Sequence, residues 1–370
     1  MKVDNENRRF ADLAIFIPSF RGGGAEKNAV LLANEIAKIG YKVDLIVTSS
    51  DGPFADDVNS NVNIVNFNCG RVLSALIPLS RYLRQRPPGT LLSFMKHANL
   101  ISILAKVLCD NKTRLVISEQ NSPLRAGKWL DRYVLAPVIS PLLYPLANAI
   151  VCVSDGIRHD LSKTLKVSDE KLVTIHNPVD LENIEHQARE EVADVWFDDP
   201  EIKTLTAAGR LVPQKDFHTL LRALAAIPKH LNWKLMVLGT GSLEQELKTL
   251  AAELELEENI KWLGFVQNPF KWMARSDLFV MSSEWEGFGN VLVEAMACGT
   301  QVISTNCPSG PSEILEDGRW GTLVEVGNHT ALAEAITYQL TTPEFKDVRA
   351  RSRHFGSPIV LRNYLEVLSL

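Results

Sequence analysis

Two glutamates, Glu286 and Glu294, give the strongest chemical signal in this 370-residue sequence, with seven residues between them. The turn Gly287-Phe288-Gly289-Asn290 separates the apolar strand LFVMSS from an apolar helix. Free backbone N–H groups at such a helix N-terminus favour an anion, while both carboxylates can accept hydrogen bonds from hydroxyl groups. Together they suit two sugar-like rings joined by a diphosphate. A hydrolase with paired carboxylates is the competing interpretation, but hydrolysis needs no adjacent anion site.

A cationic loop, GRLVPQK, stands at the end of another predicted strand. Its Arg210 and Lys215 are five positions apart, with a proline between them. An arginine binds as a fork and a lysine as a point charge, so two such cations converging on one point suit a diphosphate. Two solvated loop cations are the alternative.

Two glycine-rich loops also follow predicted strands. Gly22-Gly23-Gly24 comes after LAIFIPSF and opens a helix, and Gly239-Thr240-Gly241 comes after WKLMVL. Glycines there let backbone N–H groups approach an anion, although a tight turn without a ligand would use the same residues. Neither loop is G-x-G-x-x-G, because Glu244 stands where the second loop would need its third glycine. This speaks against a nicotinamide-dependent oxidoreductase.

The elements that must position these loops alternate between strands and helices. In the first half, helical stretches such as Ala25–Lys38 lie between several of the apolar strands, which are LAIFIPSF (13–20), KVDLIVTS, VNIVNFN, TLLSF, RLVISE and AIVCVS. Strands that alternate with helices of about 10–15 residues predict a parallel sheet covered on both faces.

The pattern restarts after LVTIHNPVD and the polar, acidic stretch that follows it. The second series has helices over 217–227, 243–254 and 290–298, between the strands TLTAAGRL, WKLMVLGTG, IKWLGFV, LFVMSS and QVISTN. We therefore expect an α/β architecture of two doubly wound, Rossmann-like domains, residues 1–180 and 181–349. Ligands of such sheets bind at the carboxyl ends of the strands, so the cleft between the domains is the expected site.

Composition and charge limit the classes of function. The chain carries 39 Lys and Arg against 44 Asp and Glu, and 46% hydrophobic residues are ordinary for a globular protein. Residues 71–140 stand out, since they hold 11 basic side chains against only Asp110, Glu119 and Asp131. This apolar, basic segment predicts a face for an anionic membrane surface or a phosphate-bearing acceptor, or else a solvated basic face over the core. No nucleic-acid recognition motif occurs, so nucleic acid is not an expected partner.

The location of the protein is predicted from its termini, cysteines and apolar runs. The N-terminus is too charged for a signal peptide, and five widely spaced cysteines without a C-x-x-C pair favour a reducing cytoplasm and buried thiols. The uncharged run Tyr133–Ser154 is long enough to span a bilayer. Its prolines Pro137, Pro141 and Pro145 favour a short helix and a buried strand instead. We expect a cytoplasmic protein that is at most peripheral at the inner face of the cytoplasmic membrane.

The whole set of motifs resembles one family. The N-terminal GGGAE, the G-R-L-x-x-x-K loop, the G-x-G loop and the E-x7-E element occur in the order typical of retaining, nucleotide-sugar-dependent glycosyltransferases of the GT-B fold, family 4. The resemblance covers roughly residues 12–368. It implies two Rossmann-like domains facing a central cleft, the first binding the acceptor and the second the donor. It also implies that residues 350–370 form a helix that crosses back onto the first domain.

The resemblance assigns roles to individual residues. Arg210 and Lys215 would hold the donor diphosphate and stabilise the charge of the leaving nucleotide. Glu286 would bind hydroxyls of the transferred sugar near the reacting carbon, and Glu294 the ribose hydroxyls. The other donor contacts would come from loop residues, namely Gly23, Gly24, Gly239, Gly241, Gly287, Phe288, Gly289, Asn290 and Val291.

The resemblance also predicts the mechanism. Fixed cations and N–H dipoles would lower the barrier where charge develops on the leaving diphosphate. No metal or other cofactor is expected, and the D-x-D ligand pattern of metal-dependent GT-A transferases is absent from the sequence. Retention of configuration would follow from front-face attack, with the donor phosphate helping to remove the acceptor's proton.

Two positions in the first half are candidate contacts for the acceptor or the sugar. His97 lies just after a strand in SFMKHAN, and Glu119 ends the next strand, where many family members carry a histidine at or beside this point. A loop histidine without a ligand and a structural ion pair are the respective alternatives. The stretch SFMKHAN…ISEQNSP resembles the branch that elongates lipid-linked oligosaccharides for bacterial surface glycans or glycoproteins, which implies a polyprenyl-diphosphate-linked acceptor.

The prediction is thus a retaining hexosyltransferase that uses a nucleotide-diphosphate sugar, UDP being the most frequent nucleotide in the family. Glucose, galactose, mannose and N-acetylhexosamines all suit Glu286. A sugar phosphorylase or a nucleotide-sugar epimerase of the same fold remains open, as does a catalytically inactive GT-B binding module. A phosphorylase would use free phosphate and show no nucleotide dependence, and an inactive module would not need all four of the charged residues above.

Overall fold

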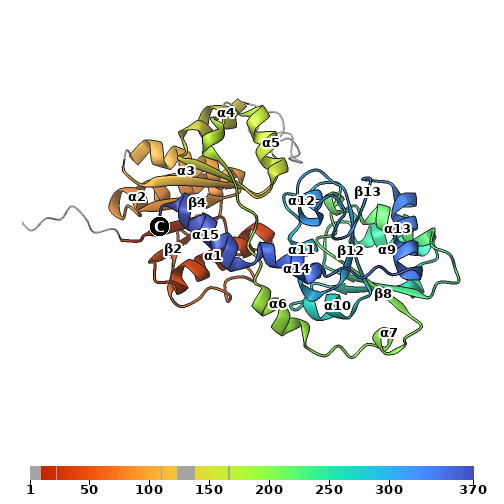
Figure 1. Ribbon diagram of the computed structural model, residues 1–370. Helices are drawn as coiled ribbons and strands as arrows, with labels where there is room; N and C mark the ends of the chain where they lie inside the picture. The colour runs from red at the N-terminus through yellow and green to blue at the C-terminus, as the bar shows by residue number, and fades with distance from the viewer. Residues whose placement is uncertain (1–9, 22, 110, 123–137, 166) are drawn as a thin grey trace, which may run out of the picture. The chain divides into compact units, whose positions relative to one another are not determined.

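The computed structural model describes residues 10–21, 23–109, 111–122, 138–165 and 167–370. The chain divides into two compact units, Met1–Pro178 together with Ser357–Leu370, and Val179–Gly356 (Figure 1). Each unit is built on one parallel sheet with helices on both faces. The predicted α/β class with two doubly wound sheets is confirmed.

The first unit has seven strands in the order β3-β2-β1-β4-β5-β6-β7, and neighbouring strands are parallel throughout. The strands are β1 (Leu13–Ile17), β2 (Val43–Val47), β3 (Val62–Asn66), β4 (Thr90–Phe94), β5 (Arg114–Glu119), β6 (Ala149–Cys152) and β7 (Leu172–Thr174). Strands β1, β2 and β4 are buried along their whole length, as runs covered on both faces require. β1 ends three residues before the predicted end, because Pro18 has no N–H for the ladder.

Helices cover this sheet in two groups. The C-terminal helix α15 packs beside α1, and both contribute to the core of the unit. Thr90 Oγ1 and Arg114 Nε, from the strands, donate hydrogen bonds to the last turn of α15 at 2.8 and 3.0 Å. The other helices lie on the opposite face, since right-handed crossovers that run in opposite directions along a sheet fall on opposite faces. The helices are α1 (Gly24–Lys38), η1 (Val72–Ala75), α2 (Leu76–Gln85), α3 (Lys96–Cys109), α4 (Ser140–Leu143), η4 (Tyr144–Leu146), α5 (Asp155–Thr164), η5 (Asp169–Lys171) and α15 (Ser357–Leu368).

The second unit has six parallel strands in the order β10-β9-β8-β11-β12-β13. They are β8 (Lys203–Ala208), β9 (Trp233–Leu238), β10 (Ile260–Gly264), β11 (Leu278–Met281), β12 (Gln301–Thr305) and β13 (Thr322–Val324). The last strand was not predicted, because three residues are too few to show a pattern. The core of the unit lies between the sheet and α8, α9 and α13.

Helices of the second unit also form two groups. α8, α9 and α13 pack together on one face, and α10, α11 and α12 on the other, where α6 and α14 join them. The helices are α6 (Leu181–Ala188), α7 (Val195–Asp198), η6 (Pro213–Lys215), α8 (Phe217–Ala225), α9 (Glu244–Glu253), η7 (Glu257–Asn259), α10 (Phe270–Arg275), α11 (Asn290–Cys298), α12 (Pro311–Leu315), α13 (His329–Thr341), α14 (Val348–Ser352) and η8 (Arg353–Phe355).

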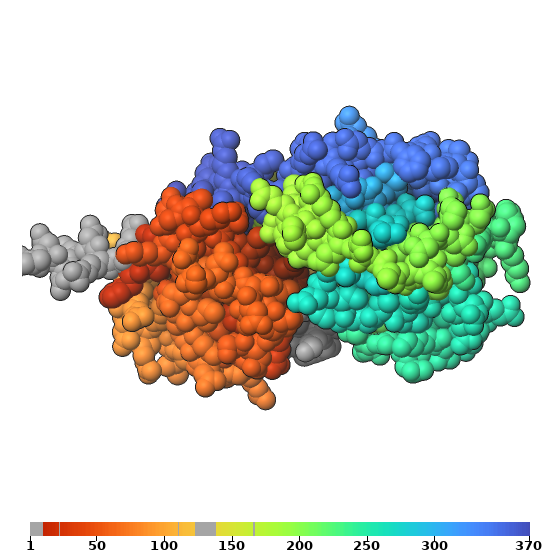
Figure 2. Space-filling view, turned by 90° about the horizontal axis from the view of Figure 1, so that it is seen from below, coloured from red at the N-terminus to blue at the C-terminus, as the bar shows by residue number. Residues whose placement is uncertain are grey.

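The acidic stretch from α6 to α7 runs along the surface of the second unit, where Figure 2 shows it in yellow-green beside the blue-green residues of β10 and α10. Asn268 Nδ2 donates to the carbonyl of Gln187 at 2.9 Å. Lys261 pairs with Asp194 at 2.6 Å and lies 4.3 Å from the ring centroid of Trp196. The stretch is therefore tied to the unit by specific polar contacts.

The order of each sheet reverses next to its first strand, between β1 and β4 in the first unit and between β8 and β11 in the second. Loops at the carboxyl ends of such a strand pair diverge, and doubly wound sheets bind their ligands there. In the second unit these loops are the predicted Arg210–Lys215 loop and the predicted Glu286–Asn290 turn. The topology thus brings the two strongest sequence signals to one edge of one sheet.

The described part of the chain contains no helix that is both long and apolar enough to cross a bilayer. Residues 123–137 lie outside the described residues, and the rest of the uncharged run forms α4, η4 and β6. All five cysteines are free. Burial raises the pKa of the Cys152, Cys298 and Cys307 thiols to about 12. Cys69 and Cys109 are only partly buried, one in the loop after β3 and one at the end of a helix, so the expectation of buried thiols is wrong for these two.

Candidate active site

The Lys215–Glu286 ion pair is the centre of the candidate site. Lys215 ends the short helix η6 after β8, and Glu286 lies in the loop after β11, 71 positions later. Lys215 Nζ lies 2.5 Å from Glu286 Oε1, and both side chains are largely buried. A buried carboxylate is costly unless it is paired and hydrogen-bonded, so the position of each of these groups depends on the other.

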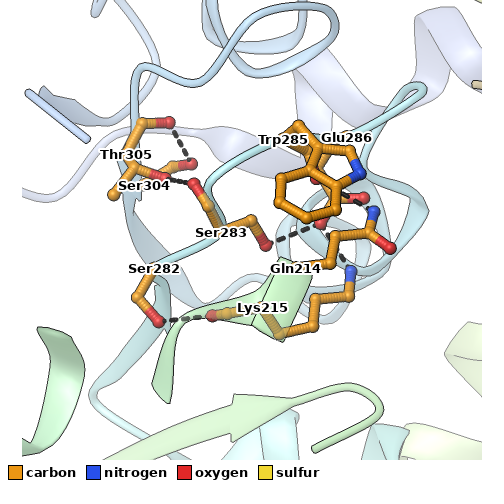
Figure 3. Close-up of polar contacts among 8 residues, drawn as sticks. All are labelled: Gln214, Lys215, Ser282, Ser283, Trp285, Glu286, Ser304 and Thr305. Carbon is orange, nitrogen blue, oxygen red and sulfur yellow. Dashed lines mark hydrogen bonds and ion pairs between the residues drawn. The ribbon is translucent and has the colours of Figure 1, made fainter. Parts of the chain in front are cut away.

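Polar side chains from three loops hold this pair in place (Figure 3). Ser283 Oγ donates to Glu286 Oε1 at 2.6 Å, so Ser283 and Lys215 share one carboxylate oxygen. Thr305 Oγ1, at the end of β12, donates to the carbonyl of Ser283 at 2.6 Å. Among the described residues, Glu286 Oε2 has no hydrogen-bond donor. The carboxylate is therefore fixed through one oxygen and can offer the other to a ligand hydroxyl.

The backbone of the two loops is joined as well. Glu284 N donates to the carbonyl of Gln214 at 2.9 Å. The Gln214 side-chain amide donates to the carbonyl of Trp285 at 2.9 Å (Figure 3). Ser282 Oγ donates to the carbonyl of Lys215 at 2.9 Å. Sequence reasoning missed Gln214 and the serines, and the only sequence signal for them is their place at the ends of strands beside the charged residues.

The helix after this loop begins as predicted, at Asn290. Its N-cap is Gly289, in the left-handed conformation with φ of 102° and without a side-chain cap. Phe288 is buried against Phe355, and its carbonyl lies so close to Gly310 that a Cβ there would come within 1.7 Å of the oxygen. The turn of residues 307–313 (CPSGPSE) thus packs against the backbone of Phe288 and supports this loop. The uncapped N-terminus of α11 adjoins the buried Glu286 and favours a negatively charged group there.

The G-x-G loop packs against the Arg210–Lys215 loop. A Cβ on Gly239 would lie 2.0 Å from the carbonyl oxygen of Gly209, and one on Gly241 would lie 2.2 Å from that of Leu211. Leu211 N also donates to the carbonyl of Thr240 at 2.9 Å. Both glycines are therefore required by the close approach of two backbones, whatever ligand they contact.

Arg210 and Glu294 are not joined to the ion pair by any described contact. Arg210 follows β8, its side chain is exposed, and its guanidinium has no partner among the described residues. Glu294 lies one turn inside α11, half-buried. Its carboxylate contributes to the raised pKa of the Cys298 thiol, after the larger effect of burial. The structure thus brings Lys215 together with Glu286 and leaves Arg210 open to solvent.

A polar hollow lies beyond the end of β10 in the same unit. Lys271 pairs with Glu190 at 3.3 Å in it. A hydrogen bond from Asn268, and then Lys271, lower the pKa of the Glu190 carboxyl. The lining residues of the hollow are Gln187, Glu190, Val266, Gln267, Asn268, Lys271 and Trp272.

In the first unit, Glu119 is the centre of a buried polar network. It is 2% exposed at the end of β5, and its Oε1 accepts hydrogen bonds from Tyr144 Oη and, at 2.9 Å, from Asn99 Nδ2. Asn99 Oδ1 accepts from Ser93 Oγ at 2.8 Å. Burial raises the pKa of the Glu119 carboxyl, against the smaller opposing effects of Tyr144 and Lys96. The hydrogen-bond donors to Glu119, Asn99 and Tyr144, are neutral groups, and a direct sugar contact by Glu119 stays a prediction.

The remaining candidates of the first unit lie at helix N-termini. Gly23 is the N-cap of α1 and Gly24 its first residue, and a Cβ on Gly23 would come within 2.4 Å of the Glu26 carboxylate. His97 is exposed in the first turn of α3, the helix that Asn99 ties to Glu119. Among the described residues, no group of three or more His, Cys, Asp or Glu side chains could hold a metal ion.

The family follows from sequence comparison. The family described as glycosyl transferases group 1 matches residues 189–353, and glycosyltransferase family 4 matches residues 22–183. The chain therefore belongs to the family 4 glycosyltransferases of the GT-B fold. It is 31% identical over 376 residues to N-acetylgalactosamine-N,N'-diacetylbacillosaminyl-diphospho-undecaprenol 4-alpha-N-acetylgalactosaminyltransferase of Campylobacter jejuni, covering 96% of this chain and 99% of that one.

Solved structures share the fold at lower identity. Anabaena HepE in complex with UDP-glucose matches with a TM-score of 0.81 and 20% identity, over 96% of this chain and 99% of that one. The lipopolysaccharide outer core galactosyltransferase WaaB, in its apo form, matches with a TM-score of 0.74 and 17% identity, over 96% and 98%. At these identities the likeness establishes the fold alone.

Proposed function

We propose that this glycosyltransferase is a retaining enzyme that moves a hexose or N-acetylhexosamine from a nucleotide-diphosphate sugar, with UDP as the nucleotide, to a polyprenyl-diphosphate-linked sugar in surface polysaccharide or glycoprotein glycan synthesis. The observation that carries this proposal is the Lys215–Glu286 pair. Lys215 supplies a cation for a phosphate group, and Glu286 supplies a carboxylate for hydroxyl groups. The pair lies beside the N-terminus of α11, which has no side-chain cap. A nucleotide sugar needs this combination where its diphosphate meets its sugar ring.

The proposed chemistry is stabilisation of the leaving group. As the bond between sugar and diphosphate breaks, negative charge grows on the diphosphate, and Lys215, Arg210 and the N–H groups of α11 compensate it. Since Lys215 and the backbone of α11 are held in place before the reaction, little reorganisation of these groups is needed at that moment. Glu286 Oε2 would accept a hydrogen bond from a sugar hydroxyl, and Glu294 would hold the ribose. The acceptor hydroxyl would attack from the same face, with the donor phosphate taking its proton.

The acceptor proposal rests on the C. jejuni relative. Its name describes transfer to a sugar on diphospho-undecaprenol in an alpha linkage. We propose the same class of acceptor here, with His97 as a contact in the first unit and Glu119 either as a second contact or as the group that holds the first turn of α3. Metal independence is part of the proposal, as is a cytoplasmic location at the inner face of the membrane.

The test is a transfer assay with purified protein. A polyprenyl-diphosphate-linked sugar is incubated with UDP-, GDP- and ADP-sugars in turn, with and without EDTA, and the product is followed by mass spectrometry and NMR. The proposal expects product from one nucleotide class, unaffected by EDTA, with the anomeric configuration of the donor. Turnover that needs free phosphate would favour a phosphorylase, and interconversion of nucleotide sugars an epimerase. Donor binding without turnover on any acceptor would favour an inactive module.

A further inference from the structure

An unusual number of large apolar side chains are exposed on one helical layer of the first unit. Of fifteen such residues among the described ones, six lie on η1–α2, α3 and α4–η4. These elements contact one another on one face of the sheet, the upper left in Figure 1. The six side chains, which we call the apolar set, are Leu73, Ile77, Val107, Leu108, Leu142 and Leu146.

The apolar and basic side chains of η1–α2 share a face. Leu73 and Ile77 are 72% and 69% exposed, and Arg81 follows at the next four-residue step, also exposed. Within α2, residues four apart lie on the same side of the helix, so Ile77 and Arg81 share a side, and Leu73 is exposed in the preceding turn η1. The opposite side carries Leu79 and Leu83, which are buried. The core therefore does not account for Leu73 and Ile77, which point away from it.

The neighbouring helix extends this face. Arg84 Nη2, in the last turn of α2, donates to the carbonyl of Leu108 at 2.7 Å, so the ends of α2 and α3 lie side by side. Val107 and Leu108 are more than half exposed there. Exposed apolar side chains therefore lie on both α2 and α3, and the pair on α3 is next to Arg84.

The charge of this layer has one sign. Residues 71–109 contain no Asp or Glu and six Lys or Arg. Among the described residues between 71 and 146, the only acidic side chain is that of Glu119, and it is buried. A surface of exposed Leu, Ile and Val among arginines, without acids, matches a partner that is anionic and apolar at once. A lipid bilayer with anionic headgroups has this chemistry. A second copy of the chain would bring like charge against like charge.

We propose that the outer face of η1–α2, α3 and α4–η4 docks onto an anionic bilayer surface. Leu73 and Ile77 enter the boundary between headgroups and acyl chains, and Arg71 and Arg81 pair with lipid phosphates. This inference deepens the proposed function and rests on it, because a polyprenyl-linked acceptor sugar is presented at a membrane surface. It also narrows the predicted membrane-binding region from the whole segment 71–140 to the outer face of these helices.

The experiment measures binding of the full chain to phosphatidylcholine vesicles with and without phosphatidylglycerol, by co-sedimentation at rising salt. The wild type is expected to need phosphatidylglycerol and to lose binding with salt. The variant Arg71→Gln/Arg81→Gln is expected to bind roughly 30-fold more weakly, and Leu73→Ser/Ile77→Ser at least about tenfold more weakly. Circular dichroism checks that each variant is folded.

Matched controls lie in the second unit. Val195→Ser and Phe345→Ser change side chains that are 72% and 82% exposed, and Arg222→Gln/Lys229→Gln removes two exposed charges. These controls are expected to bind vesicles as the wild type does. Equal loss in the controls, wild-type binding by both face variants, or binding that ignores phosphatidylglycerol would overturn the proposal. So would a dimer in light scattering that the face variants abolish.

A second assay separates this inference from the proposed function. Transfer is measured with an acceptor sugar diphosphate that carries no prenyl chain and therefore needs no membrane. Face variants that keep wild-type transfer to it but lose vesicle binding support the docking face. A wild type that binds vesicles but transfers no sugar to either acceptor would contradict the proposed function and leave the docking face standing.

Discussion

Glu119 in the first unit and Glu286 in the second are both buried glutamates near the carboxyl end of a parallel strand, yet their partners differ. Glu119 receives hydrogen bonds from Asn99 and Tyr144, and burial raises its pKa. Glu286 is 6% exposed and has the ammonium group of Lys215 at 2.5 Å. Neutral donors favour a carboxyl that holds a helix in place. A cation held beside a carboxylate favours a site for a charged, hydroxyl-bearing ligand.

The comparison shows that a position at the end of a strand does not by itself predict whether a glutamate contacts a ligand. Both glutamates end up at the edge where a doubly wound sheet binds ligands, and both were candidates for a sugar contact. Both carboxylates accept their described hydrogen bonds on Oε1, so the partner's charge and the neighbouring backbone separate them. Glu286 faces the Lys215 ammonium beside the N-terminus of α11, which has no side-chain cap, whereas Glu119 accepts from neutral groups, one of which is Asn99 in α3. The predictions that follow test this difference.

The largest effect is expected at the ion pair. Lys215→Met and Glu286→Gln should each lower kcat by roughly 30- to 900-fold, equivalent to about 2–4 kcal/mol of transition-state stabilisation. The double variant should lose much less than the product of the two, because the partners act as a unit. Steady-state kinetics measure this, and thermal unfolding checks that each variant is folded. Turnover near that of the wild type in both would contradict the assignment.

Arg210→Ala should also lower kcat, toward the smaller end of that range, because its exposed guanidinium is screened by water. Since the guanidinium has no partner among the described residues, the melting temperature should stay within about 1 °C of the wild type. A lower melting temperature with unchanged kcat would mean that Arg210 supports the fold rather than the reaction.

Ser283→Ala should have an intermediate effect. It removes the hydrogen bond that orients Glu286 but leaves the carboxylate and its cation, so we expect about a tenfold loss in kcat. Ser304→Ala is the matched control, because the buried Ser304 hydroxyl donates to the carbonyl of Thr305 and does not touch Glu286. Equal losses in the two variants would show a general packing effect.

The smallest effect on activity is expected from Glu119→Gln, which keeps an oxygen for Asn99 and Tyr144. We expect kcat to change less than about threefold. A loss above tenfold without a change in melting temperature would support a direct sugar contact instead.

The stability of the same variant should depend on pH. Because the pKa of Glu119 is raised in the folded state, the stability that its protonated form contributes is present below the ordinary glutamate pKa of about 4.3 and is lost as the pH rises through the folded value. Glutamine does not ionise. The melting temperature of Glu119→Gln relative to the wild type should therefore increase as the pH rises from about 4.3 to the folded pKa and stay level above it, and a difference that is constant across the whole pH range would contradict the raised pKa.

The sequence was enough to predict the fold, because strands such as TLLSF and RLVISE coincide with β4 and β5 and the apolar runs alternate with helices twice. It also located the loops of the candidate site, since glycines and charges stand where strands end. The predicted first strand wrongly includes Pro18, because β1 ends at Ile17. β13 is not predicted, because it has only three residues.

The pairings within the site could not be predicted. Lys215 meets Glu286 across 71 positions, and Tyr144 meets Glu119 across 25, so no local pattern records either contact. The sequence likewise left open whether the apolar residues of 71–140 face the core or solvent. Which side of α2 is buried depends on α3 and on the sheet, and Leu73 and Ile77 fall on the other side.

The central claim, that the Lys215–Glu286 pair marks a donor diphosphate site, is tested most directly by nucleotide binding. Thermal shift is measured with UDP, GDP, ADP and NAD, with and without EDTA, on the wild type, Lys215→Met and Glu119→Gln. The account predicts that one nucleoside diphosphate stabilises the wild type and Glu119→Gln equally, without a metal, and that Lys215→Met loses most of the shift. Stabilisation by NAD, by no nucleotide, or equally in Lys215→Met would contradict it.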